Sequence, residues 1–207
     1  MRTRVKICGI TCYDDAKAAI SEGADALGFV FYEPSPRYIS VEETELIFNK
    51  IPPFINTVGL FVNAKYEFVL NASNALNINL LQFHGDEDEA YCSSFGKPYI
   101  KAIRIQETTN LLDVSRQFHS ASGLLIDAFD KDKFGGTGET FDWDLLQTTC
   151  ELPIILAGGL SPDNISDAIK QTRPYAVDVS SGVEKSKGVK SHPLIKQFMK
   201  EVKCADE

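Results

Sequence analysis

A cysteine at the end of a short apolar stretch is the first residue of this chain whose position suggests chemistry. Cys8 closes residues 5–8, Val-Lys-Ile-Cys, and is followed by Gly-Ile-Thr, a turn that would lead into a helix. A thiol in this position is either a small buried hydrophobic residue or a base and nucleophile at the floor of a pocket. The rest of the chain favours the second reading, because it offers an acid and a phosphate cradle in equivalent positions.

A carboxylate stands at a comparable place later in the chain. Asp127 follows three aliphatic residues, Leu-Leu-Ile, and a carboxylate in such surroundings is costly to bury unless it is paired or used. Asp127 is therefore a candidate general acid. The structural alternative is a helix cap or an ion pair with Lys131 or Lys133.

Small residues gather in three later loops. Residues 135–138, Gly-Gly-Thr-Gly, leave the backbone free to approach a ligand or to move as a lid, which makes Gly136 a candidate contact. The loops after the last two apolar stretches contain Gly158, Gly159, Asp178, Ser180, Ser181 and Gly182. Free backbone N–H groups in two adjacent loops can hold a phosphate without a basic patch. These loops predict a phosphate site.

Two further loops offer groups that could recognise a ligand. Pro34 and Pro36 stiffen their loop and so fix the direction of Arg37, which could bind a carboxylate through two hydrogen bonds. Gln82 and His84 close another apolar stretch and are expected to form a wall of the same pocket. The alternatives are that Arg37 is a surface residue of a turn and that His84 has only a structural role.

These groups need a scaffold that brings several strand ends together. Short β-branched stretches alternate with longer amphipathic ones along the whole chain. The predicted strands are residues 5–8, 26–31, 57–61, 80–83, 99–103, 123–127, 153–157 and 176–179, and the predicted helices are 13–22, 41–50, 65–75, 87–95, 111–119, 141–149, 163–171 and 193–203. Eight such units predict the α/β class and a closed (β/α)8 TIM barrel, with residues 1–207 as a single domain. An open doubly wound sheet would normally carry a glycine-rich turn after its first strand.

The composition fits this architecture and argues against several classes of protein. A net charge of −8 argues against binding to a nucleic-acid backbone. No apolar stretch reaches the roughly 18 residues of a membrane span. Five cysteines without a C-x-x-C pair or zinc spacing predict reduced thiols, no metal site and a cytoplasmic protein. The basic residues at 185–190 are expected to form a solvated loop, which could also lie beside a phosphate.

Together, these motifs resemble the phosphoribosylanthranilate isomerase family of tryptophan biosynthesis. The matching segments are Lys-Ile-Cys-Gly at 6–9, Gly-Phe-Val-Phe at 28–31, Ser-Pro-Arg at 35–37, Gln-Phe-His-Gly at 82–85, Gly-Gly-Thr-Gly at 135–138, Phe-Asp-Trp at 141–143, Leu-Ala-Gly-Gly-Leu at 156–160 and Val-Asp-Val-Ser-Ser-Gly-Val-Glu at 177–184. Two departures are visible. Phe83 stands where the family usually has an aliphatic residue, and Lys-Gly-Val-Lys-Ser at 187–191 stands where it has Pro-Gly-x-Lys-Asp.

The resemblance implies an isomerase that performs an Amadori rearrangement without a cofactor. In this reaction N-(5-phosphoribosyl)anthranilate becomes 1-(2-carboxyphenylamino)-1-deoxyribulose 5-phosphate. The resemblance makes Asp127 the acid that opens the sugar ring and Cys8 the base at the adjacent carbon, with Arg37 on the anthranilate carboxylate. The pKa of such a thiol would have to be lowered from about 8.5. Lys6 is expected to point away from Cys8, because side chains alternate along a strand.

The implied partner is a small phosphosugar, with no nucleic acid and no membrane, and the chain could be a monomer or a homodimer. Among related barrels, the histidine-pathway isomerase would pair two aspartates. Indole-glycerol-phosphate synthase would need a catalytic lysine, for which Lys101 is the one suggestion. A barrel that binds a phosphate or a flavin without catalysis is the alternative of a different class. The presence of both Cys8 and Asp127 argues against it.

Overall fold

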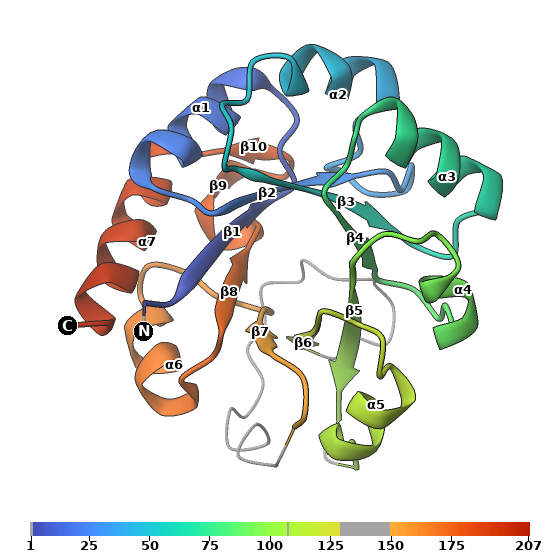
Figure 1. The fold of residues 1–207 in the computed structure, drawn as a ribbon. Helices are drawn as coiled ribbons and strands as arrows, with labels where there is room; N and C mark the ends of the chain where they lie inside the picture. Colours follow the sequence, from blue (N-terminus) through green and yellow to red (C-terminus); the bar gives the residue numbers. More distant parts are fainter. Residues whose placement is uncertain (1, 107, 129–149) are drawn as a thin grey trace.

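Eight parallel strands form a closed barrel at the centre of the computed structural model, which describes residues 2–106, 108–128 and 150–207 (Figure 1). Each strand pairs with the next, and the last closes on the first. The strands are β1 Arg4–Cys8, β2 Ala26–Val30, β3 Asn56–Phe61, β4 Leu80–Phe83, β5 Tyr99–Ile105, β6 Gly123–Ala128, β7 Ile154–Leu156 and β8 Ala176–Val179. The predicted (β/α)8 barrel is confirmed, with strand ends that differ by one or two residues from the expected ones.

Helices cover the outside of the barrel (Figure 1). They are α1 Tyr13–Glu22, α2 Val41–Phe48, α3 Tyr66–Ala75, α4 Glu89–Ser93, α5 Leu111–Gln117, α6 Ile165–Thr172 and α7 His192–Ala205. Side-chain caps start several of them: Ser40 forms a capping box with Glu43, and Ser191 caps α7. The helix expected at residues 141–149 lies outside the described residues. None of the helices in the described ranges is long and apolar enough to cross a membrane.

Helix α4 is shorter at both ends than the sequence predicts. Its expected first residue, Glu87, is buried and bonds instead to Lys101 and to the backbone N–H groups of Asn63 and Gly85. The helix therefore begins only after Asp88, whose carboxylate accepts from the Tyr91 N–H as an N-cap.

Alternation along the strands divides the buried residues into two layers. On β1, Val5 and Ile7 pack against the surrounding helices, whereas Cys8 packs inside the barrel. The register places Lys6 opposite Asp178 on β8, and Cys8 opposite Gly28 on β2. Small and aliphatic residues fill the lower interior: Ile100, Ala102, Leu125, Ile155, Ala157 and Ala176.

A short antiparallel hairpin follows β8 and was not expected from the sequence. After the helical turn η2 Ser181–Val183, strand β9 Glu184–Ser186 pairs with β10 Val189–Lys190. Gly188 packs so closely on the Pro36 carbonyl that a Cβ would clash there. The basic stretch at 185–190 is thus a structured element, in which Lys187 is exposed and Lys190 is buried.

Candidate active site

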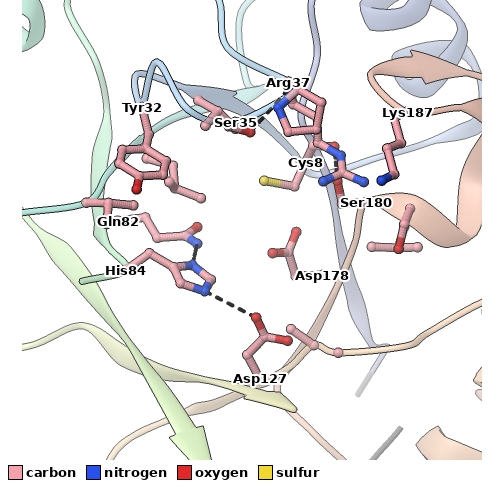
Figure 2. Close-up of a pocket in the computed structure, with 18 of the residues that line it drawn as sticks. Cys8, Tyr32, Ser35, Arg37, Gln82, His84, Asp127, Asp178, Ser180 and Lys187 are labelled. Carbon is pink, nitrogen blue, oxygen red and sulfur yellow. Dashed lines mark hydrogen bonds and ion pairs between the residues drawn. The ribbon is translucent and has the colours of Figure 1, made fainter. Parts of the chain in front are cut away.

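A cavity of about 470 Å³ opens where the strands reach their carboxyl ends, the face on which barrel enzymes carry their active sites (Figure 2). Cys8 and Asp127 face it from different walls, and Asp178 lies between them in this view. Its polar lining among the described residues is Cys8, Tyr32, Ser35, Arg37, Gln82, His84, Asp127, Asp178, Ser180, Ser181 and Lys187, joined by backbone from Gly158 and Gly159.

Cys8 ends β1 and is almost completely buried beside the cavity. Gly28 makes room for it, since a Cβ on Gly28 would lie 2.8 Å from the Cys8 Sγ. Burial raises the pKa of the Cys8 thiol; the charges of Lys6 and Lys190 lower it, and that of Asp178 raises it. The net pKa is raised. The expectation of a lowered pKa is therefore wrong, because desolvation of the thiolate outweighs the nearby cations.

Lys6 points into the barrel, so the expectation that it points away from Cys8 is also wrong. Its Nζ donates to the Asp178 Oδ2 at 2.9 Å, and both side chains are buried. The reason is the period of a strand: Lys6 and Cys8 are two residues apart and therefore share a face. Burial lowers the pKa of Lys6, but Asp178 and Cys8 raise it by more, so that the net shift is upward.

Asp127 lies one residue before the end of β6 and belongs to a chain of buried hydrogen bonds that starts at Gln82. The Gln82 Nε2 lies 3.0 Å from the His84 Nδ1, and the His84 Nε2 lies 3.2 Å from the Asp127 Oδ2. With the Gln82 amide in this orientation, Nδ1 accepts and Nε2 carries the hydrogen that is donated to Asp127. His84 thus holds the carboxyl group toward the cavity. Lys131 and Lys133, the alternative partners, lie outside the described residues.

Arg37 is held rigidly at the edge of the cavity. Its Nε donates to the Glu184 Oε1 at 2.7 Å and its Nη2 to Oε2 at 2.9 Å, and Lys190 Nζ donates to the same Oε1 at 2.8 Å. Burial raises the pKa of Glu184, but the bonds from Arg37 and Lys190 lower it by more. Gly9, with φ of +78°, leaves space for the Arg37 stem, since a Cβ there would lie 2.6 Å from Cδ.

The loops after β7 and β8 meet beside Cys8. Gly158 and Gly159 both have positive φ, which favours glycine, and Gly182 packs directly on the Leu160 carbonyl. The Ser180 hydroxyl donates to the Cys8 carbonyl at 3.1 Å, which ties the β8 loop to the end of β1. These contacts bring exposed backbone and two serines to one side of the cavity.

Most of the predicted site residues lie around this cavity, but not all of them do. Gly182 packs behind the lining, and Gly136 lies outside the described residues. Sequence reasoning missed Tyr32 and Lys187, which line the cavity, and it missed the partners of Arg37. Nothing local marked Glu184 as a partner of Arg37, although it closes the motif at 177–184.

Comparison with known proteins agrees with this geometry. Residues 5–201 match the family model described as N-(5'-phosphoribosyl)anthranilate (PRA) isomerase. The chain belongs to this family. An N-(5'-phosphoribosyl)anthranilate isomerase of Dechloromonas aromatica is 51% identical over 207 residues, 100% of this chain and 99% of that protein.

Solved PRA isomerase structures share the fold. The enzyme from Thermotoga maritima is 39% identical, with a TM-score of 0.86 over 98% of this chain and 99% of that one. A PRA isomerase in complex with reduced 1-(o-carboxyphenylamino)-1-deoxyribulose 5-phosphate is 38% identical, with a TM-score of 0.83 over the same shares. The chain is thus a TIM-barrel isomerase of the PRA isomerase family.

Proposed function

We propose that this chain converts N-(5'-phosphoribosyl)anthranilate to 1-(2-carboxyphenylamino)-1-deoxyribulose 5-phosphate, the third step of tryptophan biosynthesis. The observation that carries the proposal is that Cys8 and Asp127, a thiol and a carboxyl group, face one cavity from different strands (Figure 2). An Amadori rearrangement needs one acid and one base at neighbouring positions of a sugar. It needs no cofactor, because the reaction only moves hydrogen within the substrate.

The acid step belongs to Asp127. Its carboxyl group gives a proton to the furanose ring oxygen, the ring C–O bond breaks, and the nitrogen lone pair forms a protonated imine. The bond from the His84 Nε2 holds the carboxyl group in place during this transfer. Burial of the Gln82–His84 pair keeps the chain of hydrogen bonds away from competing water.

The base step belongs to Cys8. Its thiolate takes the proton from the sugar carbon next to the imine, and the electron pair of that C–H bond neutralises the imine to give an enolamine. The enolamine then tautomerises to the ketone. Cys8 releases to solvent the proton that it took, and Asp127 takes one up from solvent, so that atoms and charge balance over the whole cycle. The buried position of Cys8 favours this chemistry, since a desolvated thiolate is a stronger base.

The two ends of the substrate are held by different devices. Arg37, fixed by Glu184, offers its remaining guanidinium nitrogen Nη1 to the anthranilate carboxylate. The β7 and β8 loops, with Gly158, Gly159 and Ser181, offer backbone N–H groups to the phosphate. Both devices line the cavity that Cys8 and Asp127 share.

A turnover assay tests the proposal directly. Phosphoribosylanthranilate is fluorescent, so its loss reports the reaction when the purified chain is added to freshly made substrate. We expect multiple turnovers, with a product that has the mass of the substrate and is identified as an open-chain ketose by its ketone carbon in a 13C NMR spectrum. Binding of the substrate without loss of fluorescence would instead favour the non-catalytic barrel.

We also infer the setting in which the chain works. All five cysteines are free, which suits a reducing compartment such as the cytoplasm. Residues 1–207 are proposed to act as a single domain on a small phosphosugar, with neither nucleic acid nor membrane as partner. The Thermotoga maritima enzyme is described as dimeric. Light scattering on the purified chain distinguishes a monomer from a homodimer.

A further inference from the structure

A buried ion pair beneath Cys8 has no role in the steps proposed above. Lys6 Nζ lies 2.9 Å from the Asp178 Oδ2, inside the barrel and next to the thiol. A Cβ on Gly28 would lie 2.8 Å from the Cys8 Sγ and 3.0 Å from the Lys6 Cε, so the sulfur and the lysine stem flank the same small space. The second oxygen of Asp178, Oδ1, is buried without a hydrogen-bond partner among the described residues.

Such a pair calls for an explanation beyond stability. Removing two charges from water costs several kcal/mol per ion, and an apolar pair of the same volume is often as stable. A thiolate at Cys8, beside this pair, needs a nearby positive charge. It loses its hydration when it forms beside the barrel interior, and a cation at short range offsets that loss.

We propose that Lys6, held in place by Asp178, is a positioning residue that supplies the positive charge which stabilises the Cys8 thiolate. This inference rests on the proposed role of Cys8 as the base. The positive charge of Lys6 lowers the pKa of the neighbouring Cys8 thiol. Asp178 keeps the ammonium protonated and directed along the barrel wall.

The other charged groups near Cys8 cannot fill this role equally well. The charge of Lys190, on β10, also lowers the pKa of Cys8, but by less than that of Lys6, and its Nζ is bonded to the Glu184 carboxylate and to the Ser180 carbonyl. Arg37, from the loop after β2, is engaged by the same carboxylate. The other titratable groups that line the cavity are Tyr32 after β2, His84 after β4, Asp127 on β6 and the exposed Lys187 of the hairpin. Lys6 is thus the cation on Cys8's own strand and face.

The chain contains a matched control for this lysine. Lys101 on β5 is also buried, and its Nζ lies 2.9 Å from a carboxylate oxygen, that of Glu87. It does not line the active-site cavity. Lys6→Met and Lys101→Met therefore each remove one buried lysine from an ion pair of the same length, and only the first faces Cys8.

The experiment measures the thiol itself. The rate of Cys8 alkylation by iodoacetamide is followed against pH by mass spectrometry, in a Cys12→Ser background so that the peptide carries one thiol. We expect Lys6→Met to move the midpoint up by about one pH unit or more, a roughly tenfold slower alkylation below the midpoint. Lys101→Met should leave it unchanged. An unshifted midpoint in Lys6→Met, or an equal shift in both variants, overturns the inference.

A second pair of variants decides the matter if Lys6→Met does not fold. Lys6→Gln removes the charge but keeps a side-chain N–H donor for the Asp178 carboxylate, so the Cys8 midpoint should rise as in Lys6→Met, whereas Lys6→Arg keeps the charge and should leave the midpoint near that of the parent. A midpoint that is equal in Lys6→Gln and Lys6→Arg also overturns the inference. The alkylation measurement does not depend on turnover, so it tests the role of Lys6 separately from the proposed function. A fully active Cys8→Ser variant would contradict the assignment of Cys8 as the base.

Discussion

The two sides of the cavity solve opposite problems with different chemistry. Around Cys8 the side chains are charged and tightly packed, with the Lys6–Asp178 pair inside the barrel and the Arg37–Glu184–Lys190 cluster at the rim. On the other side, Asp127 is hydrogen-bonded to the imidazole of His84, which is backed by the amide of Gln82. A base must be stabilised after it loses a proton, whereas an acid must be held in place while it keeps one. The contrast follows from these two tasks.

Asp127→Asn removes the proposed general acid and should have the largest effect on turnover. The amide keeps the shape of the side chain but cannot donate an acidic proton, so we expect a loss of kcat on the order of 10³-fold or more. Turnover and thermal melting are measured on one preparation. A variant that melts earlier yet turns over normally would make Asp127 a structural residue.

Cys8→Ser breaks the base side. Serine nearly keeps the volume but is a far weaker base, and we expect kcat to fall on the order of 10²–10⁴-fold with product affinity close to that of the parent. Cys92, a buried cysteine outside the cavity, provides the control: Cys92→Ser should keep kcat per folded molecule. Near-normal kcat in Cys8→Ser would assign the base to another group.

Arg37→Ala tests the charged cluster at the rim of the cavity. This substitution should change KM much more than kcat. A carboxylate contact far from the reacting carbon contributes mainly uniform binding, so KM should rise about 10–100-fold while kcat changes little. Glu184→Gln, which loosens the arginine without removing it, should raise KM less. An unchanged KM in Arg37→Ala would place the carboxylate elsewhere.

The pH dependence tests the base side without any substitution. Because the pKa of Cys8 is raised and the base must be deprotonated, kcat/KM of the free enzyme should increase with pH by up to about tenfold per unit. The midpoint of this limb should lie above about 8.5, the ordinary value for a thiol. Initial rates at low substrate concentration between pH 6 and 9.5 measure it. A profile that is flat across this range contradicts a thiol base.

Local sequence patterns were sufficient to predict the barrel. They failed where charged residues that are distant in the sequence pair with one another. The strand and helix periods located the barrel because apolar spacing is a property of neighbouring residues. The start of α4 was predicted too early because Glu87 bonds to Lys101 on β5 instead of joining the helix. The hairpin at 184–190 was missed because its basic residues are typical of a solvated loop, whereas Lys190 is buried against Glu184.

The sequence alone determined the eight repeating units and which side chains stand at the strand ends, since both depend on residues close in the chain. It also determined the family, through motifs spread from residue 6 to residue 184. Only the tertiary structure decided which charges pair. Lys6 and Asp178 are 172 residues apart, and Arg37 and Glu184 are 147 apart. Closure of the barrel brings β8 against β1, and no local pattern encodes the partners that this closure creates.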